Sequence, residues 1–125
     1  MDYYRNILIT GCSSGLGQAL FNRVWEDDTL TPFAHYRSEH GDPHALIGDI
    51  TDPDFPEKLD NHIRKYQIDC FINNAGVYEG DIIDTNLGSQ IRMLQVVYKY
   101  FLEKEKGRII NINSVAGLYP SANES

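Results

Sequence analysis

The chain has 125 residues, of which 42% are hydrophobic, a length and composition that suit one domain over residues 1–125 and exclude a second domain with its own core. The 11 Lys and Arg residues against 18 Asp and Glu residues give a net charge of −7, which excludes nucleic acid and anionic membrane surfaces as expected partners, because no basic patch interrupts the acidic excess. Cys12 and Cys70 lie far apart outside any disulfide pattern, and the amino-terminal apolar run is too short for a signal peptide or membrane span, so we expect a soluble cytoplasmic protein.

The chain opens with a predicted strand, a glycine loop and a helix. Residues 6–10 form a short apolar run closed by Gly11, as expected of a parallel strand that is buried on both faces. After a loop at residues 11–14, apolar residues recur at helical spacing from Leu16 to Trp25, which predicts the first helix.

Two further strands are predicted at residues 32–36 and 45–50. The segment 38–43 between them is polar and contains Gly41 and Pro43, which argues against a full helix in this connection. We therefore expect an abbreviated link between the second and third strands.

The second half of the chain continues the alternation. A helix is predicted at residues 56–66, a fourth strand at 68–73, a long helix at 84–104 and a fifth strand at 108–113, with Gly107 ending the long helix. The apolar stripe expected on the long helix consists of Leu87, Ile91, Leu94, Val97, Tyr98 and Phe101.

Strands that alternate with helices at this spacing predict βαβ units with right-handed crossovers. The expected fold class is therefore α/β, a Rossmann-type doubly wound parallel sheet with strand order 3-2-1-4-5, truncated after strand five.

Glycines recur in the turn from the first strand into the first helix. Unpaired N–H groups at a helix start favour an anion, so a pyrophosphate fits there. Gly11 would make the tight turn, Gly15 would admit the phosphates, and Gly17 would let the helix pack on the strand, while Ser13 and Ser14 add hydroxyl donors. A glycine-rich turn without a ligand is the alternative interpretation of this pattern.

Five motifs along the chain resemble those of the short-chain dehydrogenase/reductase family. They are the glycine loop at residues 10–17, the pair Asp49 and Ile50, the Asn-Asn-Ala-Gly run at residues 73–76, Asn86 in the long helix, and the segment 107–114. The resemblance implies a nicotinamide dinucleotide cofactor and hydride transfer to or from a small-molecule carbonyl or alcohol substrate. The cofactor-binding positions that it implies are Gly11, Ser13, Ser14, Gly15, Leu16, Gly17, Asp49, Ile50, Asn74, Ala75 and Gly76.

The residue about 20 positions beyond the glycines indicates which cofactor is used. An acid there takes the ribose hydroxyls of NAD(H), whereas an arginine accommodates the 2′-phosphate of NADP(H). Arg37 stands 20 residues after Gly17 with Ser38 beside it, which favours NADP(H) over NAD(H), although Glu39 is close enough to weaken the site. An ordinary surface arginine is the alternative.

The resemblance implies that Ser114 and Asn86 are catalytic, together with a tyrosine acid and a lysine that follow the serine in the family. Tyr100 and Lys104 have the spacing of that pair but precede Ser114, so we interpret them as surface residues without a catalytic role. The chain ends at Ser125 before the expected position, so the alternative to an oxidoreductase is a catalytically inactive dinucleotide-binding module or sensor.

Three smaller expectations complete the set. His40 and His44 lie on either side of Asp42, but the loop lacks a third convincing metal ligand. We therefore interpret these residues as a solvated loop, with no metal site. Cys12 is interpreted as a filler of the glycine loop, the alternative being an oxidisable thiol with a lowered pKa. A sheet truncated after its fifth strand leaves an apolar face and a strand edge open, so we expect a homo-oligomer.

Overall fold

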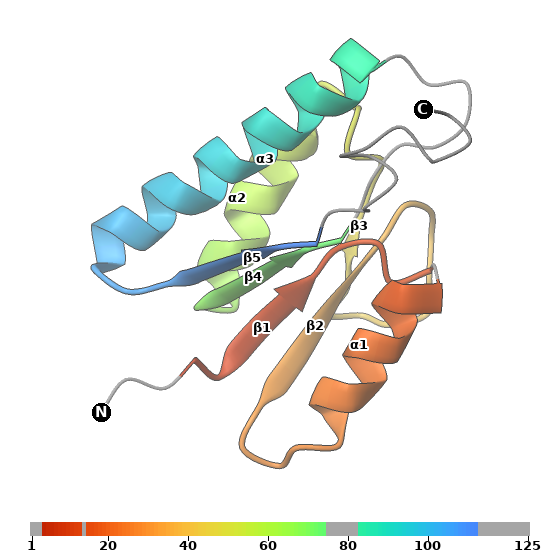
Figure 1. The fold of residues 1–125 in the computed structure, drawn as a ribbon, viewed down its shortest axis with the longest axis vertical. Helices are drawn as coiled ribbons and strands as arrows, with labels where there is room; N and C mark the ends of the chain where they lie inside the picture. Colours follow the sequence, from red (N-terminus) through yellow and green to blue (C-terminus); the bar gives the residue numbers. More distant parts are fainter. Residues whose placement is uncertain (1–3, 14, 75–82, 113–125) are drawn as a thin grey trace, which may run out of the picture.

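The computed structural model describes residues 4–13, 15–74 and 83–112. Within them, five parallel strands form one sheet in the order β3-β2-β1-β4-β5 (Figure 1). This confirms the predicted α/β fold and its strand order. The strands are β1 (Asn6–Ile9), β2 (Thr31–Tyr36), β3 (Leu46–Ile47), β4 (Cys70–Asn73) and β5 (Arg108–Asn111).

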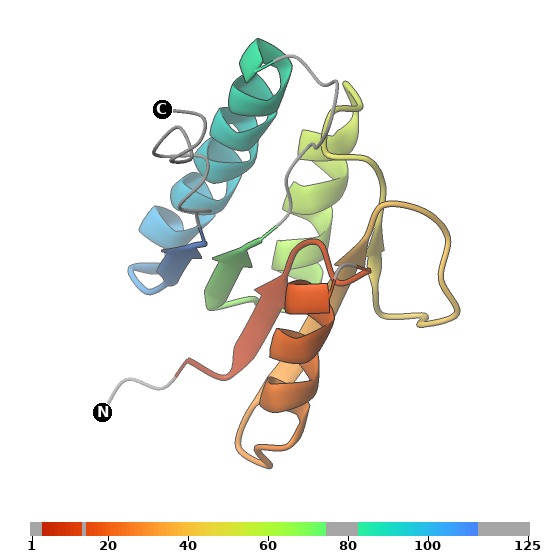
Figure 2. The same cartoon turned by 45° about the vertical axis from the view of Figure 1, so that its right-hand side comes forward.

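The helices cover the two faces of the sheet. The first helix, α1 (Gly15–Trp25), lies on one face, while α2 (Phe55–Lys65) and α3 (Ile83–Lys104) lie side by side on the other (Figures 1 and 2). The strands β1, β2 and β4 therefore place buried side chains in both core layers, as expected for a doubly wound sheet, whereas β5 is largely exposed.

The larger core layer lies between the sheet and the helices α2 and α3. Leu8 and Phe71 of the central strands are fully buried there against Leu59 and Ile63 of α2 and Val97 of α3. The smaller layer lies under α1, where Ile7, Ile9, Cys12, Ala34, Cys70 and Ile72 pack against Leu20, Phe21 and Val24. Leu16 and Trp25, at the two ends of α1, lie outside this layer and are exposed.

The apolar stripe predicted for the long helix is only partly the buried one. Met93 and Val97 are fully buried, whereas Leu87, Ile91 and Tyr98 are 55%, 46% and 59% exposed. The helix α3 has apolar side chains on two faces, and the face against the sheet and α2 follows the i, i+4 line of Met93 and Val97. Periodicity alone could not tell which face is covered.

The third strand is shorter than predicted. It has two residues in place of six, because its last ladder bond, from the Gly48 N–H to the Tyr36 carbonyl (3.0 Å), is followed at once by a turn. Residues 37–45, which lead into it, contain no helix, in agreement with the prediction of an abbreviated connection.

The end of α3 does not use Gly107 as predicted. The left-handed position after the helix is Glu105, with φ 57°. Gly107 is instead required for packing, because a Cβ built on it would lie 2.0 Å from Cγ of Phe101. Among the described helices, none combines the length and the apolar character needed to cross a bilayer.

Candidate functional site

The predicted site residues gather at the edge of the sheet where the parallel strands end. In an open α/β sheet, ligands bind outside the carboxyl ends of the strands, at the point where the strand order reverses. Here that point lies between β1 and β4, whose chains lead into the loop after Thr10 and into Asn74. The loop then enters α1, whose first turn faces the same edge (Figure 1).

The loop from β1 to α1 is held tightly against the helix. Gly11 has φ 72°, a left-handed conformation that favours glycine. A Cβ built on Gly17 would lie 2.0 Å from the Gly11 carbonyl oxygen and 2.7 Å from Nδ2 of Asn74. The absence of a side chain at Gly17 therefore allows α1 to pack on the end of β1, which is the role predicted for it.

Gly15, unlike Gly17, has free space at the position that a side chain would occupy. A Cβ built on it meets no atom within 4 Å, so the first turn of α1 opens onto empty space. Ser13 is exposed beside it, and no acidic residue lies in that turn to repel an anion. The positive end of the helix dipole therefore lies where there is room for a phosphate.

Two polar side chains connect this loop to the end of β4. Thr10 is fully buried, and its Oγ1 accepts a hydrogen bond from the Asn74 N–H (2.9 Å). The Asn74 side chain donates from Nδ2 to the Gly11 carbonyl (3.3 Å). The ends of β1 and β4 thereby form one polar floor beneath the open turn.

A chain of side-chain amides extends this floor to α3 and β5. Asn73 Nδ2 donates to Oδ1 of Asn111 at the end of β5 (3.1 Å) and to Oε1 of Gln90 in α3. Asn86, a predicted catalytic residue, lies one helical turn before Gln90 in the same helix. The structure describes the helical backbone at Asn86 and not its side chain, so the contact of α3 with the end of β4 is made by Gln90.

Arg37 and Asp49 meet at the ends of β2 and β3. Arg37 Nε donates to Asp49 Oδ2 (3.2 Å), and the Arg37 side chain remains 78% exposed. Hydrogen bonds from the N–H and hydroxyl of Thr51, with a further contribution from Arg37, hold the pKa of Asp49 below its ordinary value. The carboxylate thus orients the guanidinium through Nε, and the two terminal nitrogens are the pair that can grip a phosphate.

The remaining predicted positions differ in what they offer a ligand. Leu16 and Ser38 are exposed at the site, whereas the Ile50 side chain is buried in the larger core layer, so only its backbone could contact a cofactor. Four predicted positions lie outside the described residues: Ser14, Ala75, Gly76 and Ser114.

His35 is a site residue that sequence reasoning missed. Its ring is 2% exposed, Nδ1 accepts the Gly11 N–H (3.0 Å), and Nε2 lies 2.7 Å from the Gly48 carbonyl. The only local signal was an imidazole two residues before Arg37 in an otherwise apolar strand. Its partners are 24 and 13 residues away in the sequence, which no local pattern reveals.

Cys12 is a buried filler of the loop, as the simpler interpretation held. It is 2% exposed, its thiol donates to the Ile9 carbonyl (3.1 Å), and burial raises its pKa to about 11. The alternative of a lowered pKa is wrong in direction, since desolvation outweighs the backbone hydrogen bond with His35, which lowers the pKa.

Tyr100 and Lys104 lie at the opposite edge of the sheet from the glycine loop, near the start of β5. Tyr100 is 9% exposed, so it is not the surface residue that was predicted. Its ring lies 5.0 Å from the Lys104 ammonium and 5.0 Å from the Arg64 guanidinium, and Lys104 donates to the Ile68 carbonyl. Both residues are used in joining α3 to α2 and to the start of β4.

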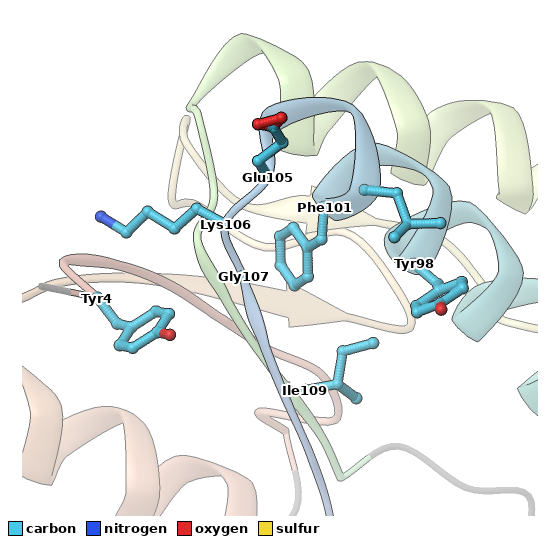
Figure 3. A pocket seen from close by; sticks show the side chains of 8 residues that line it. Tyr4, Tyr98, Phe101, Glu105, Lys106, Gly107 and Ile109 are labelled. Carbon is cyan, nitrogen blue, oxygen red and sulfur yellow. The ribbon is translucent and has the colours of Figure 1, made fainter. Parts of the chain in front are cut away.

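A hollow of about 520 Å³ lies at that same distant edge (Figure 3). Tyr4, Phe101 and Ile109 line it together with Tyr98 and Lys106. It is separate from the candidate site, because it adjoins the amino end of β5, whereas nucleotides bind at the carboxyl ends of strands.

Within the described residues, no group of three metal-binding side chains occurs, and Asp42 accepts the His44 N–H in a local turn.

Comparison with known proteins identifies relatives over nearly the whole chain. The sequence profile of the short chain dehydrogenase family matches residues 5–125. The 3-oxoacyl-(acyl-carrier-protein) reductase of Salmonella typhimurium is 28% identical over 143 aligned positions, which cover 94% of this chain and 58% of the reductase. The chain therefore spans a little over half the length of this relative.

Solved structures resemble the fold closely. A short-chain dehydrogenase from Sphingobium yanoikuyae in complex with NADPH superposes with a TM-score of 0.72 at 25% identity, over 97% of this chain and 57% of that one. A 3-alpha-hydroxysteroid dehydrogenase from Pseudomonas sp. complexed with NADH gives a TM-score of 0.70 at 23% identity, over 95% and 52%. The relatives thus include structures with either nicotinamide cofactor.

The two glycines of the first turn should respond differently to alanine. Gly17→Ala should lower the free energy of unfolding by about 1–3 kcal/mol, because the new methyl group needs space that the Gly11 carbonyl fills. Gly15→Ala is the matched control and should change it by less than about 0.5 kcal/mol, since its Cβ enters open space. Urea unfolding measures both, and equal losses would contradict the close approach at Gly17.

Proposed function

Because the chain belongs to the short-chain dehydrogenase family, we propose that it binds a nicotinamide dinucleotide, NADP(H) in preference to NAD(H), at the sheet edge formed by residues 11–17, Arg37 and Asn74. The observation that carries this proposal is the contrast between the two glycines of α1. Gly17 is closed off by the Gly11 carbonyl, whereas the space at Gly15 is open, so the helix start has room for a phosphate.

The residues present fit the parts of a dinucleotide. The open first turn of α1, with Ser13, suits the pyrophosphate, and Arg37 with Ser38 suits a ribose 2′-phosphate. Asp49 and the Ile50 backbone would border the adenine, and the loop after β4 would border the nicotinamide. This assignment extends to Leu16 beside the turn and to Ser14, Ala75 and Gly76.

The preference for NADP(H) rests on Arg37. The relatives hold NADPH in one structure and NADH in another, so family membership leaves the choice open. Asp49 accepts its hydrogen bond from Nε of Arg37, and that bond does not use the two terminal nitrogens of the guanidinium. An arginine presented in this way can donate two hydrogen bonds to a phosphate.

We further propose that the protein containing these residues is an oxidoreductase acting on a carbonyl or alcohol. The dinucleotide, when bound, supplies or receives the hydride. Ser114 would donate a hydrogen bond to the substrate oxygen, stabilising the negative charge that develops there, and Asn86 would support proton movement through α3. A binding module without turnover is the competing function.

Arg37→Gln should weaken NADP(H) binding by about ten- to a hundredfold, because a charge-assisted hydrogen bond to the 2′-phosphate is lost. NAD(H) binding should change by less than threefold. Calorimetric titration of the 125-residue chain with NADP+ and NAD+ measures both constants. Arg23→Gln, on the exposed side of α1, is the matched control and should bind like the unchanged chain. Tighter binding of NAD+ than of NADP+ by the unchanged chain would contradict the assignment.

Turnover separates the enzyme from the binding module. We expect the protein containing these residues to oxidise NADPH in the presence of at least one member of a panel of aldehydes and ketones. The measurement is the loss of absorbance of the reduced nicotinamide. Ser114→Ala should reduce that rate by about a hundredfold or more, in line with the removal of one oxyanion donor. Binding without turnover across the panel would favour the module.

The outer face of α3 supports the proposal that the chain self-associates. Leu87, Ile91, Tyr98 and Leu102 are between 46% and 59% exposed, and Leu94 lies partly buried between them. Their spacing places them along one side of the helix, which forms an apolar stripe outside the core. A second copy of the chain is the simplest cover for this stripe.

Sedimentation velocity should show a species larger than the monomer at micromolar concentration. Ile91→Glu should shift it toward the monomer, because the change places a charge in the centre of the apolar stripe. Asn22→Glu, on α1, is the control and should leave the distribution unchanged. A stable, monodisperse monomer for the unchanged chain would count against self-association.

A further inference from the structure

His35 makes two ring hydrogen bonds that tie the glycine loop to the end of β3. The Gly11 N–H can only donate, so Nδ1 must be its acceptor (3.0 Å). The Gly48 carbonyl can only accept, so Nε2 must carry the hydrogen that it receives (2.7 Å). One protonation state satisfies both bonds, the neutral ring with its proton on Nε2.

A second proton on His35 would oppose this arrangement. It would have to occupy Nδ1 and would point at the Gly11 N–H, so two donors would face each other beside a histidine that is only 2% exposed. The ring cannot turn away freely, because Phe55 of α2 packs edge-on against it at 5.3 Å. Protonation would therefore displace the Gly11 peptide.

Gly11 itself has no room to move without disturbing the rest of the site, because the peptide group on its other side is also held. The carbonyl of that second group accepts Nδ2 of Asn74 and lies where a Cβ on Gly17 would come within 2.0 Å. The next residue is fixed by the same histidine, since the Cys12 N–H donates to the His35 carbonyl (2.9 Å). The N–H groups of two consecutive loop residues thus donate to atoms of His35.

From this geometry we infer that His35 is a positioning residue for the phosphate-binding loop, and that dinucleotide binding requires its neutral ring, so that binding is lost as His35 takes up a proton. The inference rests on the proposed function and adds a proton-linked control to it. The dinucleotide need not touch His35, because the imidazole acts through the Gly11 peptide.

The surroundings of His35 favour the neutral ring. Burial lowers its pKa, and His62 of α2 adds to the shift, while the bond to Gly48 and the carboxylate of Asp49 oppose it. The other titratable neighbours keep their charge state near neutral pH, because burial raises the pKa of Cys12 and of Tyr36. Lys58 of α2 lies near Gly48 and adds a further positive charge.

The sign of the coupling follows from the lowered pKa. Folding and binding both select the neutral ring, so the full effect is present above the ordinary histidine pKa of 6.5 and is lost as the pH falls through the lower value of the folded chain. General electrostatics acts the other way, because an acidic protein becomes less negative at low pH and should bind an anion more tightly. A loss of affinity on acidification is therefore diagnostic.

The test is calorimetric titration of the 125-residue chain with NAD+ from pH 8.5 down through the pH at which nitrogen NMR shows His35 taking up its second proton. NAD+ is the probe because a 2′-phosphate has its own pKa near 6, whereas the pyrophosphate stays ionised throughout. Affinity should be constant above about pH 7 and should fall below the folded pKa, approaching tenfold per pH unit. Circular dichroism at each pH corrects for unfolding.

Variants separate the Gly11 bond from general packing. His35→Asn places an amide oxygen near the position of Nδ1 and should bind NAD+ within about threefold of the unchanged chain at pH 8, with a flat pH profile. His35→Ala removes the ring nitrogen that accepts the Gly11 N–H and should weaken binding by about 5- to 100-fold at every pH. His62→Gln removes the other buried histidine of this region and should retain the pH dependence.

The outcomes distinguish this inference from the proposed function. Absence of NAD+ and NADP+ binding at pH 8 would overturn the proposed function, and the coupling with it. Binding at pH 8 with an affinity that stays constant while nitrogen NMR shows His35 taking up its second proton would leave the function standing and overturn the role of His35. Nitrogen NMR of the ligand-free chain adds a readout without nucleotide, and a ring proton on Nδ1 in place of Nε2 at pH 8 would also overturn it.

Discussion

The contact between the Gly11 carbonyl and the bare Cα of Gly17 is the constraint on which the site depends. A methyl group at Gly17 would stand 2.0 Å from that oxygen, so α1 can reach the end of β1 only without it. The same carbonyl receives Asn74, which connects β1 to β4, and the N–H of the same glycine is held by His35 from β2. One glycine residue thereby sets the distance between a helix and three strands.

Much of the fold could be predicted because buried parallel strands are short, nearly continuous apolar runs. Asn6–Ile9 and Cys70–Asn73 are of this kind, and their alternation with helical segments was enough for the strand order. The glycine loop and Arg37 could be placed for a similar reason, since a tight turn and a phosphate contact each require a particular residue at a particular distance. These requirements concern residues that are close together in the sequence, so they can be recognised as local sequence patterns.

What could not be predicted depends on partners far away in the sequence. The helix α3 carries two apolar faces, and only the docking of α2 and the sheet decides that Met93 is buried while Ile91 is exposed. Tyr100 became a buried residue through Arg64, which lies on another helix. His35 is the clearest case. The hydrogen bonds of its ring go to two backbone groups that come together only when β1, β2 and β3 are assembled.

The hydrogen bond from Asn74 to Gly11 joins residues 63 positions apart, and this has a consequence for synthesis on the ribosome. The loop and α1 emerge first, yet their floor is completed only after β4 has left the exit tunnel. At about 5–20 residues per second, that interval is roughly 3–13 seconds, long compared with the formation of a helix. During it, the nascent chain carries strands β1 and β2 with their apolar faces uncovered, which is the state that chaperones recognise. The part of the molecule that is translated earliest is therefore among the last to acquire its final geometry.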